Sequence, residues 1–118
     1  MTARILLVED EAFIAMLLAE GLENVGFEIV GPCASVARAL SVLDQPDCCD
    51  AAVLDANLRG ESALPVAQAL RARSIPFVVT TGYLQSQLPD ALATATILSK
   101  PIRIAALVAE LERLLSRR

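Results

Sequence analysis

The 118-residue chain contains no histidine and no tryptophan, and only one tyrosine and three phenylalanines. Without histidine, it cannot itself be a histidine kinase or a phosphohistidine carrier, and it cannot complete a cysteine–histidine zinc site. So few aromatic side chains leave no platform for stacking bases. The formal net charge of −4 also argues against DNA or RNA as a direct partner.

The chain has three cysteines and no long uncharged apolar run. Cys33, Cys48 and Cys49 cannot form an even disulfide framework, and the adjacent pair lacks the spacing of a zinc CxxC motif. The first apolar run stops at Glu9, so no signal peptide is expected, and no uncharged run is long enough to span a membrane. We expect reduced thiols, a cytoplasmic location and one domain over residues 1–118.

What the chain does contain is a regular alternation of two patterns. Runs rich in leucine and β-branched residues predict strands at 4–8, 27–31, 51–55, 75–81 and 95–99. Apolar residues at helical spacing predict helices between them, the weakest at 83–94, where Pro89 would cost about 3 kcal/mol inside a helix. This alternation indicates an α/β fold: a flavodoxin-like (βα)5 doubly wound sheet of five parallel strands in order 2-1-3-4-5, with helices on both faces.

Single residues predict where elements begin and end. Pro32 should close the second strand, Ser35 and Ser62 should cap the second and third helices, and Pro101 should open the last helix. The inward face of the first helix should consist of Ile14, Leu17, Leu18, Gly21, Leu22 and Val25.

Polar side chains stand where the predicted strands end. They are Glu9 and Asp10, Asp55, Thr80 and Thr81, and Lys100. Ligand sites in open α/β sheets form at this edge. Each residue also has an ordinary structural explanation: Asp10 as a helix cap, Asp55 as a turn residue, the threonines as β-branched strand residues and Lys100 as a solvated loop residue. The glycine motifs G-x-G-x-x-G and G-x-x-x-x-G-K are missing, so nucleotide binding has no support.

The carboxylates would repel one another if they met. At about 4 Å and an effective dielectric near 20, each like-charged pair costs on the order of 4 kcal/mol. One lysine cannot neutralise three such groups, but a hard divalent cation such as Mg²⁺ or Mn²⁺ can, because it prefers oxygen ligands. An aspartate beside such an ion, with a lysine nearby, is equipped to attack phosphorus.

Four segments together resemble the signatures of the response-regulator receiver domain of two-component signalling. They are Val8-Glu9-Asp10-Glu11, Val53-Leu54-Asp55, Thr81-Gly82 and Lys100-Pro101. The resemblance covers essentially the whole chain and implies a phosphoacceptor signalling protein, not an enzyme acting on other substrates.

The resemblance also implies residue roles. Asp55 would accept the phosphoryl group, and Lys100 would contact it. Glu9, Asp10, Asp55 and the backbone carbonyl of Asn57 would hold Mg²⁺. Thr81 would be the switch hydroxyl, chosen over Thr80 because a small residue, Gly82, follows it.

Partners follow from the same resemblance. A sensor histidine kinase or a phosphotransfer protein would supply the phosphoryl group. A downstream protein, or a second copy in a homodimer, would bind the surface of the fourth helix, fifth strand and fifth helix.

The chain departs from the family pattern at several positions. Leu58-Arg59 replaces the common Met-Pro, and Ile97 occupies a position that is usually aromatic in the switch. The segment 77–83, with its Phe…Thr-Gly-Tyr pattern, is similar to a receiver subgroup associated with HWE-type histidine kinases. Because Ile97 is not aromatic, we expect Tyr83, which lies beside the switch hydroxyl in the sequence, to report the activated state in its place.

Two alternatives remain open on the sequence. A small phosphatase of the haloacid-dehalogenase type also uses a strand-end aspartate, but it normally carries a second acid where this chain has Asn57. A pseudo-receiver would bind partners without phosphorylation, although the complete acidic set and Lys100 argue against it.

Overall fold

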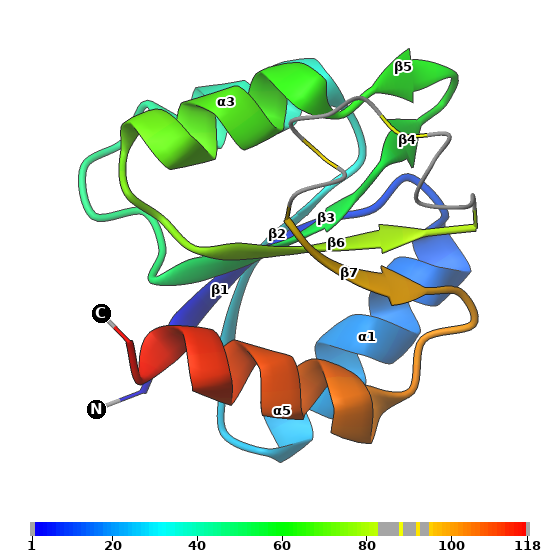
Figure 1. Cartoon of the computed structure of the whole chain (residues 1–118), viewed down its shortest axis with the longest axis vertical. Helices are drawn as coiled ribbons and strands as arrows, with labels where there is room; N and C mark the ends of the chain where they lie inside the picture. Colours follow the sequence, from blue (N-terminus) through cyan, green and yellow to red (C-terminus); the bar gives the residue numbers. More distant parts are fainter. Residues whose placement is uncertain (1, 83–87, 89–91, 93–94, 118) are drawn as a thin grey trace.

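A computed structural model describes residues 2–82, 88, 92 and 95–117. Its main sheet contains the strands β1 (Arg4–Val8), β2 (Glu28–Cys33), β3 (Ala51–Asp55), β6 (Phe77–Thr81) and β7 (Thr96–Ser99). They are parallel and lie in the order β2-β1-β3-β6-β7 (Figure 1). The predicted flavodoxin-like topology is therefore confirmed.

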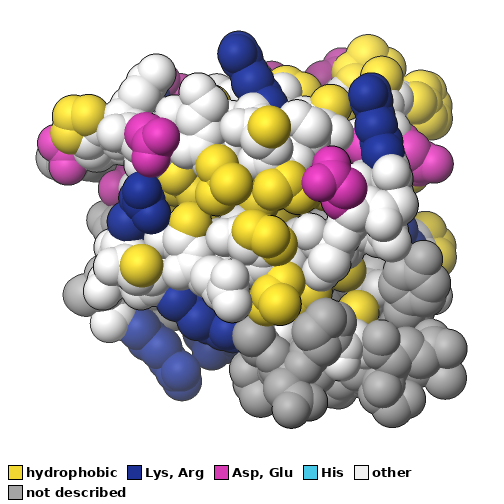
Figure 2. Space-filling view, turned by 90° about the horizontal axis from the view of Figure 1, so that it is seen from above, with side chains coloured by type: hydrophobic (Ala, Val, Ile, Leu, Met, Phe, Trp, Pro, Cys, Tyr) yellow, Lys and Arg dark blue, Asp and Glu magenta, His cyan; other side chains and the backbone are white. Residues whose placement is uncertain are grey.

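Helices cover both faces of this sheet. The helices α2 (Val36–Leu43) and α3 (Leu64–Ala72) lie on one face, and α1 (Ala12–Asn24) and α5 (Ile104–Leu115) lie on the other (Figure 1). Because side chains alternate along a strand, Leu6 and Val8 enter the α2–α3 core, whereas Ile5 and Leu7 enter the α1–α5 core. Figure 2 looks onto the α2–α3 side, where hydrophobic side chains lie across the middle and many charged side chains lie toward the edge.

The second strand extends further than expected. β2 continues through Pro32 to Cys33, so the prediction that Pro32 closes it is wrong. Among the described strands, β2 lies at the edge of the sheet and has β1 as its single neighbour, and an edge strand tolerates a residue without an N–H. The pairing register shifts between Leu6 and Val8. Gly31 (φ 99°) lies at this irregularity, where only glycine fits, because an added Cβ would lie 2.8 Å from the nitrogen of Cys33.

The first helix is turned differently from the prediction. Leu17 and Val25 are 47% and 55% exposed, and Ala15, Leu18 and Leu22 are the buried residues. The reason is the close contact with α5. A Cβ on Gly21 would lie 2.6 Å from Cδ1 of Ile104, so the smallest residue of α1 faces α5 and the larger Leu17 turns outward.

Several boundaries also differ. α5 begins at Ile104 and not at Pro101, because Ile102 packs into the α1–α5 core ahead of the helix. Ser35 caps α2 as predicted, with its Oγ accepting from the N–H of Arg38 at 3.1 Å. The N-cap position of α3 is Ala63; Ser62 lies one residue earlier and accepts from the N–H of Leu64.

Two further segments complete the description. A small antiparallel hairpin of β4 (Asn57–Leu58) and β5 (Glu61–Ser62) follows β3 and was not predicted. The predicted helix at 83–94 lies mostly outside the described residues; within it, Leu88 and Leu92 pack against the α2–α3 core. In the described part of the chain, no helix has the length and apolarity needed to cross a membrane.

The contact of Gly21 with Ile104 yields a stability prediction. Gly21→Val should lower the free energy of unfolding by about 1–3 kcal/mol, because the added methyl groups overpack the α1–α5 contact. Combining it with Ile104→Ala should cost less than the sum of the two single changes. Urea denaturation measures both quantities. Glu20→Val, on the exposed side of α1, is the matched control for the helix propensity of valine, and an equal loss there would contradict the overpacking account.

Candidate functional site

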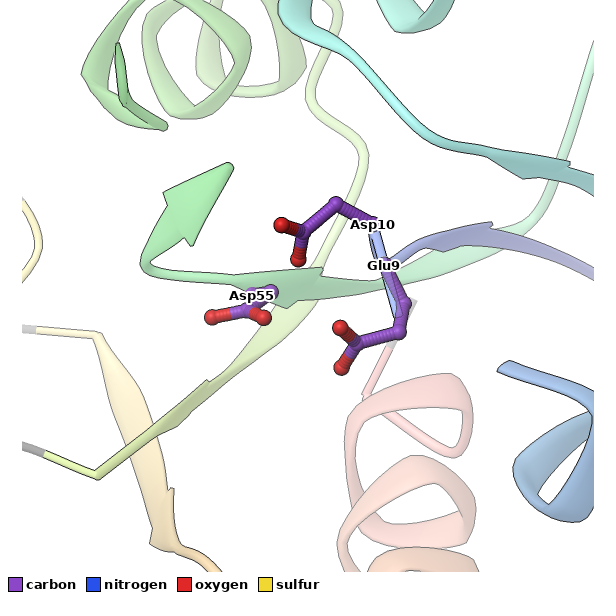
Figure 3. Close-up of side chains that lie close together, drawn as sticks. All are labelled: Glu9, Asp10 and Asp55. Carbon is purple, nitrogen blue, oxygen red and sulfur yellow. The ribbon is translucent and has the colours of Figure 1, made fainter. Parts of the chain in front are cut away.

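Three carboxylates meet where β1 and β3 end. These strands are neighbours, and Val8 pairs with Leu54, so Glu9 and Asp55 both stand one residue beyond the paired positions. One carboxylate oxygen each from Glu9, Asp10 and Asp55 lies within 4.8 Å of the others. Figure 3 shows these carboxylates converging from the two strand ends.

Asp55 uses its two oxygens differently. Its Oδ1 accepts from the backbone N–H of Asn57 at 3.2 Å, which is the turn contact expected of an ordinary strand-end aspartate. Its Oδ2 accepts from Nζ of Lys100 at 2.9 Å. The side chain is 6% exposed. The turn contact therefore orients the carboxylate, while the second oxygen faces the lysine.

Glu9 is the most deeply buried acid of the site. Its side chain is 1% exposed, and Oε2 accepts from the N–H of Glu11 at 3.1 Å. Its Oε1 has no hydrogen-bond partner among the described residues, although Nζ of Lys100 lies 3.5 Å away. Burial raises the pKa of Glu9 to about 7; the Glu11 N–H and the charge of Lys100 oppose this rise, and Asp55 adds to it.

Lys100 follows the last residue of β7 and stays charged. Burial lowers the pKa of its ammonium group, but the hydrogen bond and charge of Asp55, together with Glu9, outweigh burial and leave the pKa raised. One ammonium group thus faces an excess of negative charge.

Asp10 does not cap α1. The N-cap position belongs to Glu11, without a side-chain cap, and Oδ2 of Asp10 instead accepts from the N–H of Arg59 at 3.0 Å. Arg59 adopts a left-handed backbone (φ 53°) in the turn of the β4–β5 hairpin. The part played by the Arg59 backbone was not predicted, because no side-chain pattern marks a contact made through an N–H.

The hairpin also holds Asn57 beside the acids. Its side-chain oxygen accepts from the N–H of Gly60 at 2.9 Å, while its own N–H bonds Asp55. The side chain of Asn57 is thus engaged in the turn.

The predicted switch residues lie on neighbouring strands. Thr81 ends β6, is buried, and its carbonyl accepts from the N–H of Lys100 at 2.8 Å. Strand alternation places Thr81 on the same face as Val79, which pairs with Ile97 and packs with it in the α2–α3 core. Thr80 pairs with Asp55 in register. Tyr83 lies outside the described residues.

This donor set fits a hard divalent cation. The acids supply only oxygen ligands, and the buried Glu9 Oε1 lacks a hydrogen-bond donor in the described part of the chain, which is costly unless a cation or proton satisfies it. A bound Mg²⁺ or Mn²⁺ would relieve both the repulsion and this unsatisfied oxygen.

A family model described as "Response regulator receiver domain" matches residues 5–112. The chain belongs to this family. Receiver domains belong to two-component systems, in which they interact with histidine kinases or phosphotransfer proteins and with downstream targets, and they bind Mg²⁺ through acidic residues.

Three similar proteins and structures place the chain within the family. The transcriptional regulatory protein PdtaR of Mycobacterium tuberculosis is 33% identical over 97% of this chain, which spans 57% of PdtaR. The solution structure of SdrG from Sphingomonas melonis Fr1 is 42% identical, covers 97% of both chains and has a TM-score of 0.81. A solution structure of the BeF3-activated conformation of SdrG, from Pseudomonas melonis Fr1, is 41% identical over 98% of this chain and 99% of that one, with a TM-score of 0.80.

The raised pKa of Glu9 predicts a pH dependence of stability. Because folding favours the protonated acid, the metal-free free energy of unfolding should fall as pH rises from about 4.5 to about 7, by roughly 1–3 kcal/mol. Glu9→Gln should remove this component. Denaturant titrations of both proteins at a series of pH values measure the difference. Mg²⁺ at pH 8 should stabilise the wild type more than the variant, and equal pH profiles would contradict the assignment.

Proposed function

We propose that residues 1–118 form a receiver domain that accepts a phosphoryl group on Asp55 from the phosphohistidine of a partner kinase or phosphotransfer protein. A carboxylate oxygen of Asp55 attacks phosphorus, the phosphorus–nitrogen bond breaks, and the leaving imidazole keeps the electron pair and takes up a proton. The observation that carries this proposal is the 2.9 Å contact of Asp55 Oδ2 with Lys100 Nζ inside the cluster of acids.

The neighbouring residues have distinct roles in this proposal. Glu9, Asp10 and Asp55, with the carbonyl of Asn57, would hold Mg²⁺, which would neutralise charge on the carboxylates and the phosphoryl oxygens. Lys100 donates a hydrogen bond to the phosphoryl group, for which its present contact with Asp55 positions it. The N–H of Asn57 keeps the aspartate oriented.

Phosphorylation is then read out through Thr81. A hydrogen bond from its hydroxyl to a charged phosphoryl group is worth about 1.5–3 kcal/mol, which biases a two-state equilibrium by one to two orders of magnitude. The carbonyl of Thr81 is bonded to the N–H of Lys100, so the end of β6 is tied to the end of β7. We expect the surface of residues 83–94, β7 and α5 to respond, and a target protein or a second copy to bind there.

The phosphoryl donor needs a second surface near Asp55. Phe13, Met16 and Leu17 are 67%, 52% and 47% exposed, and their spacing places them on one side of α1, which begins two residues after Asp10. A donor that brings its histidine to Asp55 must cover this neighbourhood. This exposed apolar face of α1 therefore suits an apolar surface of the donor protein.

The relative SdrG supports an activatable state, since one of its structures is its BeF3-activated conformation. The phosphatase alternative gains no support, because Asn57 stands in place of the second acid and its side chain bonds Gly60. The pseudo-receiver alternative is disfavoured by the contacts of Lys100 with Asp55 and Glu9.

The phosphoacceptor assignment is tested with acetyl phosphate and Mg²⁺. Intact-mass spectrometry should show one added phosphoryl group on the wild type. It should show the same on the control variant Asp44→Asn, because Asp44 is an exposed acid outside the site. Asp55→Asn should remain unmodified, since an amide is a poor nucleophile. Modification of Asp55→Asn to the wild-type level would disprove the assignment. Hydrolysis of a generic phosphomonoester that is lost in Asp55→Asn would instead favour the phosphatase alternative.

The donor surface is tested separately. A phosphotransfer screen against sensor kinases identifies the donor. Phe13→Asp should then slow transfer from this donor at least about tenfold, because a charge replaces an apolar side chain that the donor would cover in the complex. Phosphorylation by acetyl phosphate should not change. Val25→Asp is the matched control: this residue is also exposed but lies at the opposite end of α1. Equal effects of both changes would contradict this choice of surface.

A further inference from the structure

Two adjacent thiols meet at the end of the sheet opposite the acids. Cys48 and Cys49 lie in the connection from α2 to β3, at the amino-terminal end of the strands (Figure 1). Their sulfur atoms are 3.5 Å apart. Adjacent side chains in an extended strand point to opposite sides, so this connection folds the two thiols toward each other.

Both cysteines line a cavity with a volume of about 480 Å³. The cavity is formed by residues 43–50 and 73–75. Cys48 is nearly buried, whereas Cys49 is partly exposed. A small reagent can therefore approach the pair from the cavity, which would not hold for two thiols in a closed core.

Arginines on both sides hold this connection in place. Arg4 donates from its side chain to the carbonyl of Asp47 at 2.9 Å, and its backbone N–H donates to the carboxylate of Asp50 at 2.7 Å. Arg73 donates to the carbonyl of Leu43 at 3.0 Å. These hydrogen bonds restrict the loop that carries the two thiols. Little further conformational freedom is therefore lost when both sulfurs bind one atom.

The geometry suits a bridging atom better than a direct disulfide. Consecutive Cα atoms are about 3.8 Å apart, below the usual range of about 4.4–6.8 Å for a disulfide, so a bond between adjacent cysteines is strained. With bonds of about 2.3 Å, as in zinc thiolates, sulfurs 3.5 Å apart subtend an angle of about 100° at a bridging atom. Such an angle matches a pyramidal trivalent centre.

We propose that Cys48 and Cys49 form a dithiol site for a trivalent metalloid, such as arsenic in a trivalent arsenical. With phenylarsine oxide, two sulfur–hydrogen bonds break and two arsenic–sulfur bonds form, while the oxygen leaves as water with both protons. Arsenic stays trivalent and no electrons are exchanged. Burial, followed by the nearby Cys48 thiol, raises the pKa of Cys49 to about 12, which disfavours a cation that requires Cys49 as a thiolate and suits a reaction that releases the thiol protons as water.

The test uses the full chain and phenylarsine oxide as the probe, in the presence of excess monothiol. Native mass spectrometry should show one adduct on the wild type that a competing dithiol removes. Cys49→Ser and Cys48→Ala should each weaken binding at least about a hundredfold, because the second sulfur acts at high effective concentration. Cys33→Ser is the matched control: this cysteine is buried at the end of β2, and its loss should leave the adduct unchanged.

Circular dichroism establishes that each variant is folded, and Cys49→Ser, at the partly exposed position, keeps the test valid if Cys48→Ala unfolds. The absence of a wild-type adduct, or wild-type affinity in Cys49→Ser, would overturn the proposal. So would an adduct lost equally in Cys33→Ser.

Discussion

The repulsion among buried carboxylates is the constraint on which the rest of the site depends. Glu9 and Asp55 follow directly after the last paired residues of β1 and β3, so the pairing of these strands keeps their backbones adjacent. Lys100 reaches both acids from the end of β7, but one ammonium group cannot balance all the negative charge. The folded chain therefore carries an excess of negative charge at the strand ends, which a bound cation would neutralise. The parallel sheet holds the acids close together.

Much of the fold could be predicted because several independent patterns agree. Apolar runs, the spacing of helical residues and the serine before α2 all indicate the same order of elements. The predictions that were wrong concern features that depend on tertiary packing. The orientation of α1 depends on how closely Ile104 approaches Gly21, and the continuation of β2 past Pro32 depends on its place at the sheet edge. Neither is encoded in a local pattern.

The same distinction applies to the site. The proximity of Glu9, Asp10, Asp55 and Lys100 could be anticipated, since parallel strands bring their carboxyl ends to one edge. The contact of Asp10 with the Arg59 N–H could not, because it depends on the small β4–β5 hairpin and on a left-handed residue within it. The sequence also does not show that one oxygen of Asp55 accepts from the N–H of Asn57 while the other accepts from Lys100, because a motif does not distinguish a turn contact from an ion pair.

The two outer strands of the sheet differ in a way that bears on self-association. An outermost strand carries unpaired backbone groups that can recruit a strand from another molecule. On one border, Pro32 within β2 lacks a hydrogen-bond donor and the strand is irregular around Gly31, so it is a poor template for a strand from another molecule. The opposite border, β7, contains no proline. Pairing with a strand of another molecule is thus disfavoured at the β2 edge, whereas β7 lacks this obstacle.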